Sequence, residues 1–246
     1  MKTVVMIGDS FGVPNYYGPP GAEPEIHVEF LLRKKKYNVI NLSENASANE
    51  RHYSQLSLFI ATNPTIVIDY VVWFHNASMN LIPPLSIEFK ITDVVKNRLL
   101  QSYKDMQELK KKHTAKWIVI GGSSPLPDFF YPFEIHDHVI PDWRAKILNE
   151  NLPQVFGSGF TQNRDIIQSE LNVESSEVKR KSIDDFNRIQ RMLSRNRNLF
   201  PDGCHPGIKP HYDLANELDN LIQAWPAGAS GEGRTHIGQL SVAHGI

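Results

Sequence analysis

The chain has 246 residues, of which 41% are hydrophobic and 22% are charged, and this composition is typical of a globular domain with a full hydrophobic core. The formal net charge of -1 provides no polycation for nucleic acid or for an anionic membrane, so we exclude both as partners. The single cysteine excludes an internal disulfide.

Apolar runs with the character of buried parallel strands alternate with helical patterns along the chain. The first run is too short for the apolar core of a signal peptide, so we expect a cytoplasmic protein. Strands are predicted at 3–7, 37–42, 65–74 and 116–121, and helices at 24–36, 49–61, 93–113 and 208–224. In the last helix, the inner face is predicted to carry Tyr212, Ala215, Leu218 and Ile222. The alternation predicts an α/β protein with a parallel, doubly wound sheet.

Two short motifs carry the chemistry. The first strand ends at Gly-Asp-Ser, residues 8–10, and Asp-Gly-Cys-His-Pro, residues 202–206, precedes the last helix. A serine at the carboxyl edge of a parallel sheet lies where open α/β folds bind ligands, but it needs a base and an orienting carboxylate to act as a nucleophile. Ser10, His205 and Asp202 supply these three groups. The chain resembles the SGNH (GDSL-type) hydrolases, which carry both motifs in this order.

The resemblance also implies an oxyanion hole. The second and third motifs of the family correspond to residues 41–46 and 74–77, which depart from the family pattern at several positions. The implied donors are the backbone N–H groups of Ser10 and Ala46 and the side-chain amide of Asn76. Alanine keeps the N–H that the glycine of the family donates, provided that the backbone does not need a positive φ at this position.

The resemblance further implies a three-layer α/β/α flavodoxin-like sandwich, which we assign to residues 1–226. Within it, residues 123–181 break the strand–helix alternation, and we expect either an insertion that shapes the substrate site or an added helical cap with its own small core. Residues 227–246 are rich in small residues without apolar periodicity, and we interpret them as a flexible tail.

The predicted function is that of a serine esterase that cleaves short-chain, acetyl-type esters. Tyr16 and Tyr17 follow the nucleophile in a turn-rich loop, and their aromatic faces suit a small-molecule or carbohydrate ester. Alternatives are a lysophospholipase or thioesterase with the same catalytic groups, or an inactive module that binds glycans or has a structural role. The oligomeric state is left open.

No cofactor is expected, because each chemical step already has a side chain. The alternative is a metal site at His136 and His138 that His205 or His211 would complete. These histidines have no recognisable metal-ligand spacing in the sequence, so we predict that the enzyme is independent of metal.

Overall fold

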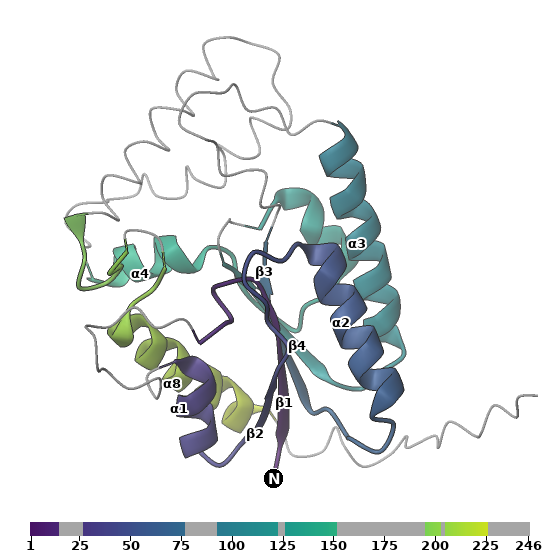
Figure 1. The fold of residues 1–246 in the computed structure, drawn as a ribbon, viewed down its shortest axis with the longest axis horizontal. Helices are drawn as coiled ribbons and strands as arrows, with labels where there is room; N and C mark the ends of the chain where they lie inside the picture. The colour runs from purple at the N-terminus through teal and green to yellow at the C-terminus, as the bar shows by residue number, and fades with distance from the viewer. Residues whose placement is uncertain (15–26, 77–92, 123–125, 152–194, 203–204, 226–246) are drawn as a thin grey trace, which may run out of the picture.

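The computed structural model describes residues 1–14, 27–76, 93–122, 126–151, 195–202 and 205–225. Five strands form one parallel sheet in the order β2-β1-β3-β4-β5 (Figure 1). They are β1 (Thr3–Gly8), β2 (Asn38–Asn41), β3 (Tyr70–His75), β4 (Lys116–Gly121) and β5 (His138–Ile140). The described helices are α1 (Val28–Lys34), α2 (Asn49–Thr62), α3 (Asp93–Lys111), the 3₁₀ helix η3 (Asp128–Phe133), α4 (Trp143–Asn151) and α8 (Ile208–Ala224). The predicted parallel α/β sheet is confirmed.

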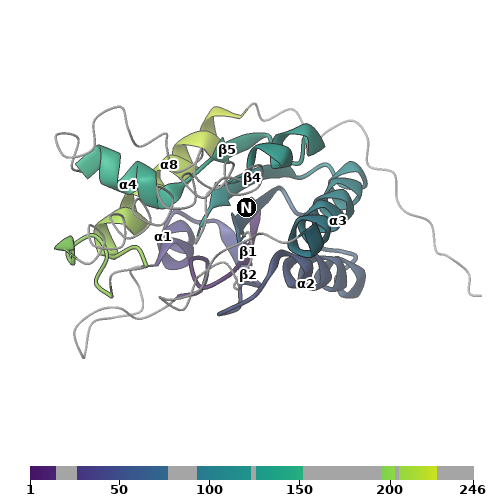
Figure 2. The same ribbon diagram turned by 90° about the horizontal axis from the view of Figure 1, so that it is seen from above.

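Alternation of side chains along the strands explains the three layers. In β1, Val4 and Met6 point into a core shared with α1, α4 and α8, whereas Val5 and Ile7 point into a second core shared with α2, α3 and η3. A strand that is apolar at every position needs this cover on both faces. Seen from above, the two groups of helices lie on opposite sides of the sheet (Figure 2). The predicted α/β/α sandwich is therefore confirmed.

Gly8 allows β1 and β3 to approach closely at their carboxyl ends. Gly8 is paired with Phe74, and a Cβ at Gly8 would lie 2.5 Å from the Cβ of Phe74. The φ angle of Gly8 is 154°, which L side chains rarely adopt. Ser10 and Asn76 each follow this pair by two residues, so both lie at the carboxyl edge of the sheet.

The structure corrects some predicted boundaries. Residues 65–69 lie outside β3, which begins at Tyr70, and α1 begins at Val28 with His27 as its N-cap. The short strand β5 was not predicted. It pairs with β4, and η3 and α4 flank it in sequence, so residues 126–151 of the expected insertion belong to the sandwich.

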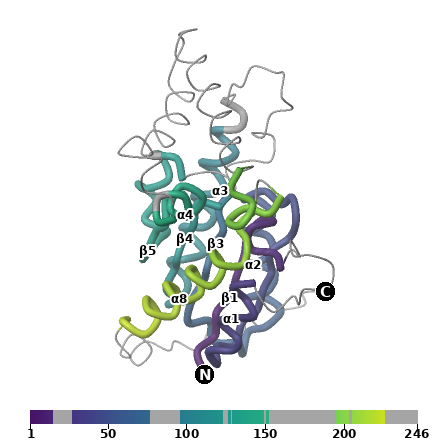
Figure 3. Tube along the Cα trace, turned by 90° about the vertical axis from the view of Figure 1, so that its left-hand side faces the viewer, coloured from purple at the N-terminus to yellow at the C-terminus, as the bar shows by residue number. Residues whose placement is uncertain are grey.

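The prediction for the inner face of α8 is wrong at one position. Tyr212 is 46% exposed, and the buried positions include Leu214, Leu218 and Ile222. These residues pack with α1 against the sheet, and α8 runs beside α1 in Figure 3. Ala215, Leu218 and Ile222 are buried as predicted, so the predicted inner face is confirmed except at Tyr212, and Leu214 is buried in addition.

Several predictions concern residues outside the described ranges. These residues are Tyr16, Tyr17, residues 152–181 of the expected insertion and the tail 227–246. In the part of the chain that the structure describes, no helix combines the length and the apolar character needed to cross a bilayer.

Candidate active site

The structure brings Ser10, His205 and Asp202 into one hydrogen-bonded chain. Ser10 follows the end of β1, and its Oγ lies 2.7 Å from Nε2 of His205. Nδ1 of the same imidazole lies 2.6 Å from Oδ2 of Asp202. Both partners precede α8, and the serine is 195 positions away from the histidine in sequence. The fold thus joins the two motifs at the carboxyl edge of the sheet.

The partners of His205 decide where its proton lies. An ionised carboxylate accepts hydrogen bonds and donates none, so Nδ1 carries the hydrogen toward Asp202. In the neutral imidazole, Nε2 is then an acceptor, and the hydroxyl of Ser10 donates to it. This is the arrangement in which a histidine can act as a general base toward a serine.

A closed loop holds the acid and the base. The backbone N–H of His205 donates to Oδ1 of Asp202 at 2.7 Å, so both oxygens of the carboxylate bind the same residue. The N–H of Gly207 donates to the carbonyl of Leu199 at 2.7 Å. This bond joins the chain before Asp202 to the chain after His205. Leu199 and Phe200 are buried and anchor this segment in the core.

The surroundings of the triad leave part of it open to solvent. Phe11 packs beside the imidazole, with ring centroids 5.2 Å apart, while the side chain of His205 remains 19% exposed. Asp9 is buried and has a structural role, because its Oδ1 accepts the N–H of Phe11 at 3.0 Å and its carbonyl accepts the N–H of Gly12 at 3.0 Å. This turn fixes the direction of Ser10.

Asn76 is buried at the carboxyl end of β3 and is held at two points. Its side-chain Nδ2 donates to the carbonyl of Ser47 at 3.2 Å, and its backbone N–H donates to Oδ1 of Asn49 at 3.1 Å. A primary amide carries two hydrogens. The bond to Ser47 therefore fixes the plane of the amide and the direction of the second hydrogen.

Ala46 lies in the loop between β2 and α2 with a φ of 63°. We expected alanine to replace the glycine of the family without cost only if φ is not positive here. The backbone of Ala46 instead adopts the left-handed region that favours glycine. Ala46 is exposed, and no hydrogen bond of its N–H is found among the described residues. The next residue, Ser47, contacts Gly8 and Asn76, so this loop lies beside the ends of β1 and β3.

Three buried histidines lie near this edge of the sheet and are neutral. Burial lowers the pKa of His27 to about 4, and it lowers the pKa values of His52 and His75 to about 3. His75 precedes Asn76 and its Nε2 lies 2.7 Å from the hydroxyl of Tyr103. None of these imidazoles supplies a charge to the site at neutral pH.

The sequence analysis missed the residues that hold the oxyanion candidates. Ser47 and Asn49 contact Asn76, and His52 contacts Ser47. The available signal was the alternation of serine and asparagine at positions 43, 45, 47 and 49, directly after a predicted strand. Such side chains often bind the backbone of loops at the ends of strands.

The residues of the alternative metal site have other partners. His136 packs against the rings of Phe130 and Tyr131, while His205 belongs to the hydrogen-bonded chain with Ser10. His211 packs against His27 and Trp143. Within the described ranges, no group of three or more histidine, cysteine, aspartate or glutamate side chains could hold a metal ion.

Comparison with known proteins gives likenesses of structure only. No family model matches the chain, and no curated protein matches its sequence. A solved lipase/acylhydrolase from Enterococcus faecalis is 17% identical, with 91% of this chain and 96% of that chain covered and a TM-score of 0.44. A member of the lipolytic G-D-S-L family from Veillonella parvula is 10% identical, with coverages of 91% and 100% and a TM-score of 0.45.

A carbohydrate acetylesterase family member from Sinorhizobium meliloti is also similar. It is 13% identical to this chain, the alignment covers 91% of this chain and 98% of the other chain, and the TM-score is 0.46. These are the structures that the fold is similar to. Because identity and TM-score are low, these likenesses carry no argument about the function of this chain.

Proposed function

We propose that this protein is a serine esterase that hydrolyses short-chain, acetyl-type esters through an acyl-enzyme. The observation that carries the proposal is the continuous chain of hydrogen bonds from Ser10 through His205 to Asp202. A serine hydroxyl is a weak nucleophile at neutral pH, and an oriented imidazole is what activates it. An inactive binding module has no need for this arrangement.

The roles of the three residues follow from the hydrogen positions. Oγ of Ser10 attacks the acyl carbonyl while its proton passes to Nε2 of His205. Asp202 stabilises the imidazolium that results. The imidazolium then returns the proton to the leaving alcohol, which departs and leaves an acyl group on Ser10. In the second half, water attacks the acyl carbonyl while His205 takes one of its protons. The tetrahedral intermediate then collapses: Oγ of Ser10 leaves and takes that proton back from the imidazolium, and the acid is released.

The oxyanion formed at each attack needs donors aimed at it. The proposed donors are the backbone N–H groups of Ser10 and Ala46 and the side chain of Asn76. Support for this part comes from the common location of these residues at the ends of β1, β2 and β3. One such donor typically contributes a factor of about 10²–10³ to the rate.

The short acyl group is proposed from the sequence. Tyr16 and Tyr17 would contact a polar or carbohydrate alcohol. The sequence has no long apolar stretch that resembles a lid for a lipid tail and no basic amphipathic helix that suggests docking to a membrane. A lysophospholipase or thioesterase would use the same triad on a longer acyl chain. The chemistry of the alcohol and of the acyl chain therefore needs its own measurement.

The test of the reaction is Ser10→Ala with p-nitrophenyl acetate as substrate. We expect no turnover above background and no labelling by a fluorophosphonate, with a melting temperature within a few degrees of the wild type. Ser54→Ala, on the exposed face of α2, is the matched control and should keep full activity. Turnover by Ser10→Ala at the wild-type rate would contradict the proposed nucleophile.

The test of the substrate is a series of p-nitrophenyl esters from acetyl to dodecanoyl. We expect kcat/KM to be highest for acetyl and to fall with chain length, and we expect acetylated sugars to be hydrolysed. A steady rise toward dodecanoyl would favour the lysophospholipase.

A further inference from the structure

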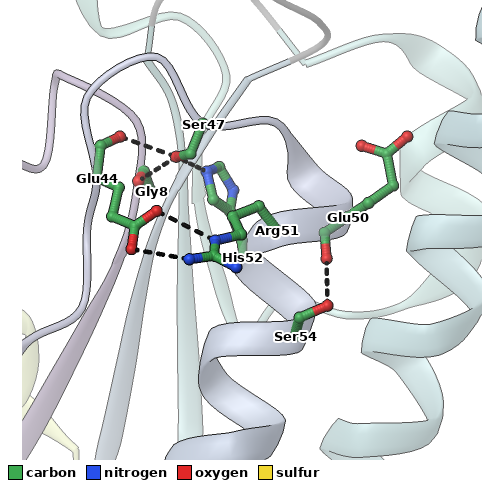
Figure 4. Close-up of polar contacts among 7 residues, drawn as sticks. All are labelled: Gly8, Glu44, Ser47, Glu50, Arg51, His52 and Ser54. Carbon is green, nitrogen blue, oxygen red and sulfur yellow. Dashed lines mark hydrogen bonds and ion pairs between the residues drawn. The ribbon is translucent and has the colours of Figure 1, made fainter.

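A second pair of serine and histidine lies beside the proposed triad, below the loop that connects β2 to α2. Nε2 of His52 lies 2.8 Å from Oγ of Ser47. Both side chains are buried, with exposed fractions of 0% for His52 and 6% for Ser47. Figure 4 shows the pair between the end of β1 and the first turns of α2. The distance between the two side chains is that of a nucleophile and its base. Which nitrogen of His52 carries the hydrogen therefore decides whether Ser47 could act as a nucleophile.

The neighbours of His52 place its proton on the opposite nitrogen from that of His205. Nε1 of Trp73 donates to Nδ1 of His52 at 3.0 Å, and an indole nitrogen only donates. The neutral imidazole therefore carries its hydrogen on Nε2 and donates it to Ser47. A histidine in this tautomer cannot take the proton of the serine, so Ser47 is not a second nucleophile.

The hydroxyl of Ser47 joins three segments of the site. Its oxygen lies 2.9 Å from the carbonyl of Gly8 and 2.9 Å from the carbonyl of Glu44, so its single hydrogen is shared between these acceptors. Its own carbonyl accepts the side-chain amide of Asn76. One residue thus contacts the end of β1, the loop that carries Ala46, and the end of β3.

An exposed ion pair in the same loop contributes less to the position of Ser47. The guanidinium of Arg51 contacts the carboxylate of Glu44 at 3.1 and 3.3 Å, but these side chains are 60% and 48% exposed. Ion pairs in such positions contribute little to stability. The buried bond from His52 therefore contributes more to the position of the Ser47 hydroxyl than this ion pair does.

We propose that His52 is a positioning residue for the oxyanion hole and acts through Ser47 on the amide donors of Asn76 and Ala46. The inference rests on the proposed esterase function and extends it. Trp73 fixes the tautomer, His52 fixes the hydroxyl of Ser47, and Ser47 fixes the two donors. Displacement of a positioned group by about 1 Å can cost about 10²-fold in rate.

The experiment measures hydrolysis of p-nitrophenyl acetate by Ser47→Ala and His52→Leu, with Ser54→Ala as the control for a serine of α2 that lies outside this network. We expect kcat to fall about 10²-fold in both variants, because His52 acts through the hydroxyl that Ser47→Ala removes, while KM stays within about twofold of the wild type. Ser54→Ala should be unchanged. His52→Gln keeps a donor and an acceptor on one side chain, so it should restore most of kcat.

A second readout separates positioning from a loss of folded protein. Phenylboronic acid forms a tetrahedral adduct on an active serine and so resembles the oxyanion state. Its inhibition constant should rise in Ser47→Ala and His52→Leu by the same factor as kcat/KM falls. Trp73→Phe removes the indole donor together with part of a buried ring, and it should show a smaller loss of the same kind in kcat and in phenylboronate inhibition.

The outcomes distinguish the inference from the function on which it rests. If the wild type is active and Ser47→Ala matches Ser54→Ala in kcat and in phenylboronate inhibition, the positioning role is wrong and the esterase stands. If the wild type does not hydrolyse the ester and Ser10 is not labelled by a fluorophosphonate, the proposed function and this inference are both wrong.

Discussion

Asp202→Asn is the substitution that tests the proton arrangement of the site most directly. In the wild type, one carboxylate oxygen accepts Nδ1–H of His205 at 2.6 Å and the other accepts the backbone N–H of the same residue at 2.7 Å. An amide has only one oxygen, so either orientation sets its NH₂ group against an N–H group. The backbone N–H cannot move its hydrogen, whereas the imidazole can change tautomer. The NH₂ group of the substituted side chain would therefore face Nδ1 of His205, and the hydrogen of the imidazole would move to Nε2.

The cost of this change has two parts. Returning the imidazole to the active tautomer breaks the neutral hydrogen bond from the amide to Nδ1, about 0.5–1.5 kcal/mol. The imidazolium in the transition state also loses the attraction of the carboxylate, which at about 4 Å and an effective dielectric constant of about 20 is up to about 4 kcal/mol. The pair is partly exposed, with 19% and 29% of the two side chains accessible, so we take about 5 kcal/mol in total, or roughly 10⁴-fold in kcat.

The assay is steady-state hydrolysis of p-nitrophenyl acetate, combined with a thermal melt. Asp137→Asn is the matched control, because Asp137 also accepts a backbone N–H, from Trp117 at 2.8 Å, and lies outside the triad. We expect it to keep the wild-type kcat. A loss smaller than tenfold in Asp202→Asn, with the fold intact, would refute the tautomer argument.

Other predictions address the oxyanion candidates and the buried histidines. Asn76→Ala should lower kcat by about 10²–10³ with little change in KM, and a rise in KM at constant kcat would instead indicate ground-state binding. Ala46→Gly should raise the free energy of unfolding in a urea titration by about 0.5–1 kcal/mol, because relief of the φ of 63° outweighs the entropy of glycine in the unfolded chain. His27, His52 and His75 keep pKa values of about 3 to 4 when folded but titrate near 6.5 when unfolded, so the unfolded chain binds more protons below pH 6.5. Stability should therefore fall as the pH falls from 6.5 toward 4, and His52→Gln should reduce that slope by up to about 1.4 kcal/mol per pH unit in denaturant titrations.

The proposed triad residues could be located from the sequence because markers of local structure surround them. Gly8 and Gly12 flank the serine, and Pro206 follows the histidine just before a helix. These residues restrict the backbone on their own, whatever the rest of the fold does. The β strands were found for a similar reason, since β1, β3 and β4 are apolar at nearly every position.

Features that depend on packing between distant segments could not be predicted in this way. His52 and Trp73 are 21 residues apart, and the direction of the indole N–H depends on the sheet. In α8 only Tyr212 was misplaced, because stripes through Tyr212 and through Leu214 both fit a helical period that includes Leu218 and Ile222. Packing with α1 against the sheet buries Leu214 instead. β5 has three residues, too few for an apolar run to be visible.

The separation along the chain of the groups in the triad bears on how the protein folds. The bonds between Asp202 and His205 close over three residues, whereas the bond between His205 and Ser10 closes over 195. Local contacts form quickly, and contacts between distant segments wait for the topology to be complete. We therefore expect the acid and base to pair early during refolding, while esterase activity returns only when α8 docks onto α1. In a refolding experiment, recovery of activity would thus report the final docking step, and circular dichroism would report the earlier formation of helices.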